Sequence, residues 1–243
     1  MNRYKLFKIV RSALVFLTAF SSISVFAAAS FTLDTLIKVG NEKGHGAFTL
    51  KNLERETVYI KGTVSQIKVV DGEIKKIPLT RDNFPIWDLA INPSKLRLLP
   101  GEVRDVAIKY LCQEDCDRSK DLVYQIRFAP VSPPETPEGQ KVVVSFGMAP
   151  YYITPALKSD VHYEWDYDEK AKKVTINNTG NTYLKVQFDN CNNNLREERR
   201  CKAVYHVLAG RYMEIDLPEG LIGNNVQVTV ADHDQRYQDE FTL

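Results

Sequence analysis

The sequence predicts an all-β protein built from two β-sandwiches in tandem, and three observations lead to this prediction. From Ser30 onward, short runs of alternating apolar and polar residues follow one another, separated by turn signals such as Asp71-Gly72 and Pro100-Gly101. The first half contains no stretch with the apolar periodicity of a three-turn amphipathic helix. A short connector, Thr154–Ser159, divides the strands into two groups. Many short strands with regular turn signals are typical of β-sandwiches.

The N-terminus has the three parts of a secretory signal: a basic segment, a short apolar run and a small-residue cleavage site. These parts are Arg3 to Arg11, Ala13 to Phe26 and Ala27-Ala28-Ala29. We therefore expect residues 1–29 to be a signal peptide that is cleaved after Ala27 or Ala29. An uncleaved anchor is the alternative, but the run is short for a membrane span. No later stretch is long and apolar enough to insert stably, so we expect no stable membrane insertion.

The first domain is expected over residues 30–155, with about seven to nine strands. Asp71-Gly72 is a strong signal for a two-residue hairpin, and the proline-rich segment Val131–Gly139 is expected to be a loop. The expected strands are Phe31–Val39, Ala47–Leu53, Thr57–Val70, Glu73–Leu79, Trp87–Ile91, Lys95–Leu99, Val103–Leu111, Leu122–Phe128 and Gln140–Pro155.

The second domain is expected over residues 156–243 as a smaller sandwich. We expect the turn Asn178–Asn181 to join the strands on either side of it as a hairpin, and we expect a cleft between the two domains. The expected strands are Val161–Tyr167, Lys173–Asn177, Thr182–Phe188, Lys202–Leu208, Tyr212–Leu217, Val226–Ala231 and Asp239–Leu243.

Charge and cysteine content narrow the function classes. The 32 basic and 31 acidic residues give a formal net charge of +1, which does not indicate a nucleic-acid partner. Four cysteines allow three pairings, and secretion permits disulfides. We expect the two local pairs, Cys112–Cys116 and Cys191–Cys201, because each is joined by a short polar segment. A four-thiolate zinc site is the alternative.

No catalytic constellation stands out, so we expect a protein that is not an enzyme and needs no metal or cofactor. The four histidines, His45, His162, His206 and His233, are scattered, and no metalloprotease or nucleophile-elbow motif is present. The run from Asp232 to Asp234 could hold a metal, but a solvated turn before the last strand is the more ordinary interpretation.

The run Gln140–Pro155 lacks a charge from Val142 onward. Side chains alternate faces along a strand, so one face would carry four large apolar residues: Val142, Val144, Phe146 and Met148. The other face would carry smaller residues suited to close packing. Pro150 and Pro155 cannot donate to a sheet ladder, which predicts an edge or last strand. The run is either an ordinary core strand or a strand that lends its apolar side chains to another protein.

The order of these segments resembles the periplasmic chaperones of the chaperone–usher pathway, in the PapD-like superfamily. The resemblance rests on the secretory signal, the run Asn92–Glu102, the strand Val123–Phe128 and the strand Gln140–Pro155. The segment from Tyr59 to Pro100, Asn178-Thr179-Gly180-Asn181 and the Cys191…Cys201 pair followed by Leu208-Ala209-Gly210 look most similar to the branch that serves alpha-type fimbriae of the class 5 and common-pilus kind.

This resemblance implies two immunoglobulin-like sandwiches and a mechanism. A fimbrial subunit is an immunoglobulin-like domain that lacks its last strand, and the chaperone fills the open groove with a strand of its own. The donor residues would be Val142, Val144, Phe146 and Met148. The implied partners are pilus subunits and an outer-membrane usher, and the implied location is the periplasm.

The chain departs from the commoner family pattern in one place. Many members bind the subunit's terminal carboxylate with an arginine in the first strand and a lysine in the last strand of domain 1. Here the first strand offers Lys38, and Met148–Tyr151 contains no lysine. The remaining candidates for the carboxylate anchor are Lys38, Arg127 and Lys158, with Thr154 and Tyr152 as hydrogen-bonding partners.

Two other classes of protein remain open. A fimbrial subunit or tip adhesin of immunoglobulin-like fold should carry a donor extension or an incomplete sandwich, and we see neither. A secreted hydrolase or metal-binding protein with an accessory sandwich domain is the third possibility.

Overall fold

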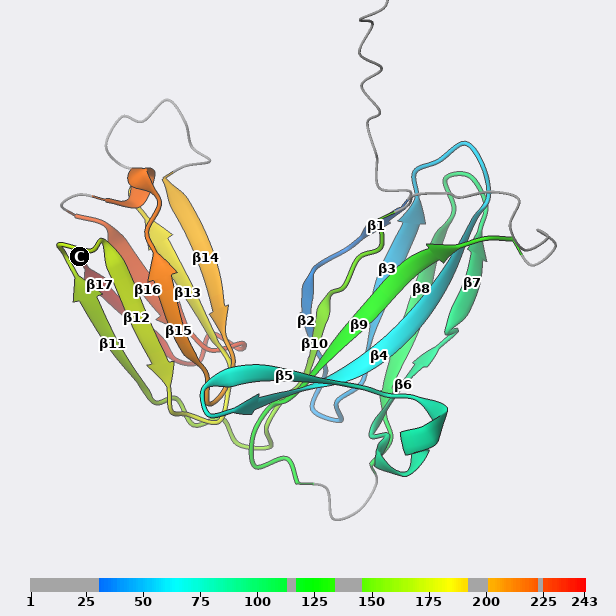
Figure 1. Cartoon of the computed structure of the whole chain (residues 1–243), viewed down its shortest axis with the longest axis horizontal. Coiled ribbons are helices and arrows are strands. Elements are labelled where there is room, and N and C mark those ends of the chain that lie inside the picture. The colour runs from blue at the N-terminus through cyan, green and yellow to red at the C-terminus, as the bar shows by residue number, and fades with distance from the viewer. Residues whose placement is uncertain (1–30, 113–116, 134–145, 192–200, 223–224) are drawn as a thin grey trace, which may run out of the picture.

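A computed structural model describes residues 31–112, 117–133, 146–191, 201–222 and 225–243. It contains two β-sandwiches side by side (Figure 1). The predicted all-β fold is therefore confirmed. The predicted signal peptide, residues 1–29, lies outside the described residues. Within the described residues, no helix is long and apolar enough to cross a membrane.

The first sandwich is formed by β1 to β10. In the described chain, one sheet has the order β1-β3-β8-β6, and the other has the order β2-β10-β9-β4-β5, with β7 also paired to β4. Fully buried aromatic rings of Phe48, Phe128 and Tyr152 meet edge to face between the sheets. The strands are β1 Phe31–Leu33, β2 Ile37–Val39, β3 Gly46–Asn52, β4 Val58–Val70, β5 Glu73–Pro78, β6 Leu89–Asn92, β7 Lys95–Leu98, β8 Val103–Tyr110, β9 Leu122–Val131 and β10 Tyr151–Thr154.

The expected single strand Phe31–Val39 is two strands in different sheets. β1 pairs antiparallel with β3, whereas β2 pairs parallel with β10. Asp34 fixes the crossing point, because its backbone N–H donates to the Thr49 carbonyl and its carboxylate accepts the Thr49 N–H, each at 3.1 Å. The first strand therefore ties the two sheets together.

The expected strand Trp87–Ile91 was placed too early. A 3-10 helix, η1 (Arg81–Ile86), precedes it, and β6 begins at Leu89. The Asn83 side chain accepts the Thr80 N–H and donates to the Pro78 carbonyl, which stabilises this turn locally. Such side-chain bonds to nearby backbone compete with strand pairing.

The second sandwich is formed by β11 to β17, with described sheets β11-β12-β15 and β14-β13-β16-β17. β10 ends at Thr154 and β11 begins at Tyr163, so the boundary that we predict after residue 155 falls between the two sandwiches. The strands are β11 Tyr163–Asp168, β12 Lys173–Asn178, β13 Leu184–Asp189, β14 Lys202–Val207, β15 Tyr212–Asp216, β16 Gln227–Ala231 and β17 Gln238–Thr242, with a short 3-10 helix, η2, at Glu219–Leu221.

The hairpin expected across Asn178–Asn181 is wrong, because β12 and β13 lie in different sheets. The buried Asn178 side chain donates to the carbonyls of Thr182 and Val207, at 2.9 and 3.0 Å, and so holds the chain as it crosses between sheets. The Asn181 side chain donates to the carbonyls of Ser119 and Lys158. This turn therefore connects the two sandwiches instead of closing a hairpin.

An apolar cluster, which we call the junction cluster, lies between the sandwiches. Tyr183 and Leu208 of the second sandwich pack against the outer face of the sheet that contains β10. The residues of the first sandwich in this cluster are Ile37, Val39, Ile67, Val69, Ile74, Val123, Tyr151 and Ile153. Because this part of the sheet is covered on both faces, its strands carry apolar side chains on both faces.

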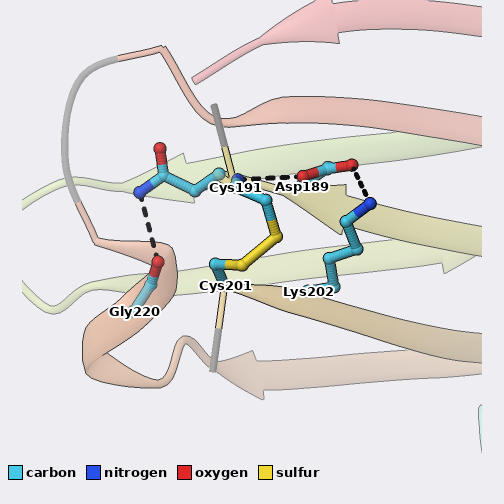
Figure 2. The surroundings of a disulfide bond; sticks show 6 residues. Asp189, Cys191, Cys201, Lys202 and Gly220 are labelled. Carbon is cyan, nitrogen blue, oxygen red and sulfur yellow. Dashed lines mark hydrogen bonds and ion pairs between the residues drawn. A yellow bond between two sulfur atoms is a disulfide. The ribbon is translucent and has the colours of Figure 1, made fainter. Parts of the chain in front are cut away.

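Cys191 and Cys201 form the predicted disulfide, with 5.1 Å between their Cα atoms. Figure 2 shows that it closes the β13–β14 connection beside Asp189, which binds the Cys191 N–H and the Lys202 ammonium. Cys112 is also disulfide-bonded, and its predicted partner, Cys116, lies outside the described residues. The alternative of a four-thiolate zinc site is therefore wrong.

We predict that peptide mapping without reduction recovers one crosslink between Cys191 and Cys201 and a second between Cys112 and Cys116. Each short loop should contribute roughly 2–3 kcal/mol to the free energy of unfolding. Denaturant titrations with and without reductant measure this contribution. A crosslink between Cys112 and either Cys191 or Cys201 would contradict the pairing.

Candidate functional site

The segment before β10 continues the register of β10 against β9. Tyr152 pairs with Tyr124, and Met148 forms an isolated bridge with Phe128, with two backbone hydrogen bonds of 2.8 and 2.9 Å. Tyr152 is fully buried in the first sandwich, and Met148 packs against the same core. Alternation along this segment therefore turns Phe146, Met148 and Tyr152 toward one face, the core side of the sheet.

The side of this segment away from β9 is covered only in part. β2 pairs with Tyr151–Ile153, and the Tyr151 N–H donates to the Leu36 carbonyl at 2.8 Å. In the described part of the chain, no strand pairs with residues 146–149 on that side. The expected strand Gln140–Pro155 is shorter than predicted, because among its described residues only β10, Tyr151–Thr154, is a strand and residues 146–149 contribute only the Met148 bridge. The prediction of an edge strand is wrong for Tyr151–Ile153, where β2 docks on the side away from β9. We call residues 146–149 the open edge.

Two exposed apolar side chains lie at the open edge, one within it and one in the segment before β2. Phe146 is 57 % exposed and Leu36 is 63 % exposed, whereas Met148 is half-buried. Gly147 is required here, because a Cβ at this position would lie 2.6 Å from the Phe128 carbonyl oxygen. The other predicted donor residues, Val142 and Val144, lie outside the described residues.

Lys38, a predicted anchor, is bound to other groups of the first sandwich. Its ammonium donates to the Asp34 carboxylate and, at 2.7 Å, to the Ala47 carbonyl, and it lies 5.5 Å from the centre of the Phe48 ring. Burial opposes ionisation of Asp34, but the hydrogen bonds from Lys38 and Thr49 outweigh it and hold the Asp34 pKa below its usual value. Lys38 and Asp34 thus form a structural pair at the strand crossing.

The other predicted anchor residues lie apart from one another. Arg127 is exposed on the outer face of β9, the face that also carries Val123 of the junction cluster. Lys158 is exposed in the connector. Thr154 is fully buried, and its hydroxyl has no hydrogen-bond partner within the described residues. Among those residues, no hydrogen bond or ion pair joins any two of these four candidates.

Sequence reasoning missed two charged residues that hold the connector. Arg118 is buried and donates to the Pro155 and Glu42 carbonyls, and its guanidinium lies 5.9 Å from the Tyr110 ring centre. Asp121 is buried and accepts the N–H groups of Ala156, at 2.9 Å, and Tyr183, at 2.8 Å. A charged residue in a sequence does not reveal that it will be buried, so no local signal could have identified either.

Burial raises the pKa of Asp121 above its usual value, and the hydrogen bonds from Ala156, Tyr183 and Thr182 offset this only in part. Thr182 donates to the Asp121 carboxylate at 3.1 Å and lies 3.3 Å from His233 Nδ1. One carboxylate therefore binds the connector and the second sandwich at the same time.

A concave cavity of about 900 Å³ lies beside the connector, lined by both sandwiches. Its lining includes Glu42 and Arg118 from the first sandwich and His233, Asp234 and Arg236 from the second. In the described chain, no group of three or more His, Cys, Asp or Glu side chains is arranged to hold a metal ion. The possible metal site at Asp232–Asp234 therefore gains no support.

We predict that Phe146→Ser changes the stability of the free protein by only about 0.5 kcal/mol, as is usual at surface sites. Phe128→Ser should cost about 3–5 kcal/mol, because Phe128 is fully buried in the core. Denaturant unfolding of both variants measures the difference. Equal destabilisation would show that Phe146 belongs to the protein's own core.

We predict a pH-dependent effect of Asp34→Asn on stability. Because the folded-state pKa of Asp34 lies below the usual 3.8, its contribution is present above that value and is lost as the pH falls through the folded-state pKa. The wild-type advantage should be within about 1 kcal/mol, since the pair is partly exposed. Urea unfolding of both proteins between neutral and acidic pH tests this. A gap that widens on acidification would contradict it.

Comparisons with known proteins agree with this architecture. The crystal structure of the class 5 fimbriae chaperone CfaA matches with a TM-score of 0.53 and 15 % identity, over 87 % of this chain and 98 % of that one. A chain from the complex of Salmonella enterica SafA pilin with the SafB chaperone matches with a TM-score of 0.57 and 12 % identity, over 89 % and 97 %. The E. coli chaperone DraB matches with a TM-score of 0.53 and 15 % identity, over 88 % and 98 %.

At these identities the structural matches establish the fold, which is the two-domain β-sandwich of fimbrial chaperones. No curated protein sequence matches the chain significantly. The sequence profile of the CS5 fimbrial protein N-terminal domain matches residues 33–155, just over half of the chain. These residues comprise nearly all of the first sandwich, including the open edge. The chain therefore belongs to the family of the CS5 fimbrial protein N-terminal domain.

Proposed function

We propose that this protein is a fimbrial assembly chaperone, not an enzyme, and that it binds a pilus subunit by adding a strand to it. The observation that carries the proposal is the open edge: Phe146 is exposed on the core-side face of a segment that bridges to β9 on one side and pairs with no described strand on the other. An edge of this kind invites pairing with another chain. The two-sandwich fold shared with fimbrial chaperones is consistent with this role.

Strand addition would combine two sources of affinity. Backbone groups of the open edge would pair with the subunit, and alternate side chains would fill its groove. The donor side chains would be Val142, Val144, Phe146 and Met148. Each apolar side chain of this size contributes about 1.5–3 kcal/mol when it becomes fully buried.

A cation would complete the site by binding the terminal carboxylate of the subunit. Arg127 and Lys158 have exposed side chains, whereas Lys38 already binds Asp34 and the Ala47 carbonyl. We therefore rank Arg127 and Lys158 ahead of Lys38. Thr154, being fully buried, would first need the chain around it to move.

The proposal extends to the cellular setting. Residues 1–29 would direct the chain to the periplasm and be removed, and the chaperone would hand its subunit to an outer-membrane usher. The family match and the likeness to CfaA favour a place among chaperones of class 5-type fimbriae.

We predict that Phe146→Ser and Met148→Ser reduce recovery of a co-expressed fimbrial subunit with the purified protein. The reason is that the subunit groove loses its filling, and the unprotected subunit is degraded. Phe84→Ser is the matched control, because Phe84 is 64 % exposed on η1, far along the chain from the open edge. The same assay can locate the carboxylate anchor. The anchor is the residue whose replacement by alanine lowers recovery, among Arg127→Ala, Lys158→Ala and Lys38→Ala.

Undiminished recovery with both open-edge variants would reject strand addition at this site. A fimbrial subunit or tip adhesin, the other candidate role, gives a different result. Such a protein would itself accept a strand, so a synthetic donor-strand peptide would raise its melting temperature, which is not expected for a chaperone.

A further inference from the structure

The β4–β5 hairpin extends beyond the sheet to which it belongs. β4 pairs with β9 up to the Ile67–Val123 pair, but it continues to pair with β5 as far as Val70 and Glu73. Lys68 to Val70 and Glu73 to Lys75 therefore form a two-stranded ribbon outside the sheet. Figure 1 shows β5 crossing the front of the molecule, with its turn at the second sandwich.

The turn of this hairpin contacts the second sandwich directly. Asp71 and Gly72 both have positive φ, 54° and 77°, as the predicted two-residue hairpin requires. The Tyr212 N–H donates to the Gly72 carbonyl at 3.3 Å. A Cβ on Gly72 would lie only 3.1 Å from the Tyr212 Cβ, so the two backbones approach closely.

Behind the turn, one face of the ribbon joins the junction cluster. Val69 and Ile74 pack there with Tyr183 and Leu208. A Cβ on Gly210, also in the second sandwich, would lie 3.8 Å from Val69 Cγ1. Val70 follows on the opposite face of the strand and is 36 % exposed. An isolated two-stranded ribbon is marginally stable in water, so these contacts stabilise the overhang as well as the junction.

A second attachment lies at the connector, where Asp121 binds Ala156 and Tyr183 and Asn181 binds Ser119 and Lys158. A single attachment leaves two bodies free to rotate about it. A second attachment through a different element removes most of that freedom. The hairpin turn and the connector attach to different elements of the first sandwich, the β4–β5 hairpin and the segment before β9.

We propose that the β4–β5 hairpin is a strut that fixes the orientation of the two sandwiches. Its positioning residues are Val69 and Gly72, which act through Tyr212 and the junction cluster. If the proposed chaperone function holds, the strut also presets the space between the sandwiches before a subunit arrives. Preorganisation of this kind improves affinity by reducing the ordering cost of binding.

Distance measurement between spin labels on the two sandwiches tests the strut. Labels at the exposed positions Lys51→Cys and Glu169→Cys report on the orientation, with the native cysteines left oxidised. In the otherwise unchanged chain we expect one narrow distance distribution. Val69→Asp should broaden or split it, because a carboxylate cannot remain in the junction cluster. Val70→Asp, its neighbour on the exposed face, should leave the distribution unchanged, and Val69→Ile should preserve the narrow peak.

Gly72→Val provides a second variant at the tip, remote from both sandwich cores, in case Val69→Asp fails to fold. A narrow, unshifted distribution in every folded variant of Val69 and Gly72 would overturn the strut. Equal broadening by Val70→Asp would overturn it as well.

Recovery of a co-expressed subunit, measured alongside the distance distribution, distinguishes a failure of the strut proposal from a failure of the proposed chaperone function. Val69→Asp, compared with Val70→Asp, should lower recovery severalfold if the preset orientation serves capture. Unchanged recovery despite a broadened distance distribution would reject that consequence. Failure of the proposed function would instead appear as full recovery with Phe146→Ser, which leaves the distance measurement unaffected.

Discussion

The crossing of the first strand at Asp34 determines which residues before β10 remain uncovered on the side away from β9. β1 and β2 belong to opposite sheets, and the bonds between Asp34, Thr49 and Lys38 fix the point at which the chain changes sheet. Because β2 is only three residues long, it covers Tyr151–Ile153 and leaves residues 146–149 uncovered. A longer β2 would complete the sheet and remove the open edge. Exposed edges are normally avoided in folded proteins, so this one is consistent with a binding role.

The second sandwich packs against the outer face of the sheet that carries the open edge. Tyr183 and Leu208 cover its outer side near Ile153, and the buried Asp121 carboxylate binds backbone from the connector and from Tyr183. Breaking either contact would expose apolar surface or leave a buried charge without its donors, and both outcomes are costly. β10 is therefore held firmly at Tyr151–Thr154, while the residues just before it pair on one side only. A segment paired on both sides and a segment paired on one side only are therefore adjacent in the sequence.

The sequence was enough to locate most of the strands, but it did not show which strands pair with one another. Alternation and turn chemistry located β4, β5 and the Asp71-Gly72 turn, because these depend on neighbouring residues. The Asn178–Asn181 turn was misread as a hairpin, because the side chain of Asn178 bonds Val207, which is distant in sequence. The strand pattern placed Phe146 on the same face as Met148 but left open whether that face is buried in the protein's own core. The burial of Arg118 and Asp121, and the binding of Lys38 by Asp34, depend on tertiary contacts that no local pattern encodes.

Lys38 and Arg127 show why the charge of a residue does not by itself identify an anchor. Both were equal candidates by composition, yet one ammonium has a carboxylate, a carbonyl and an aromatic ring around it, and the other side chain is exposed to solvent. A cation that already has an internal partner would have to give up those bonds before it could bind a subunit carboxylate. An exposed arginine loses only hydration and gains a bidentate contact. The crossing that leaves the edge open thus also engages Lys38, so Arg127 on β9 and Lys158 in the connector are the better candidates for the proposed carboxylate anchor.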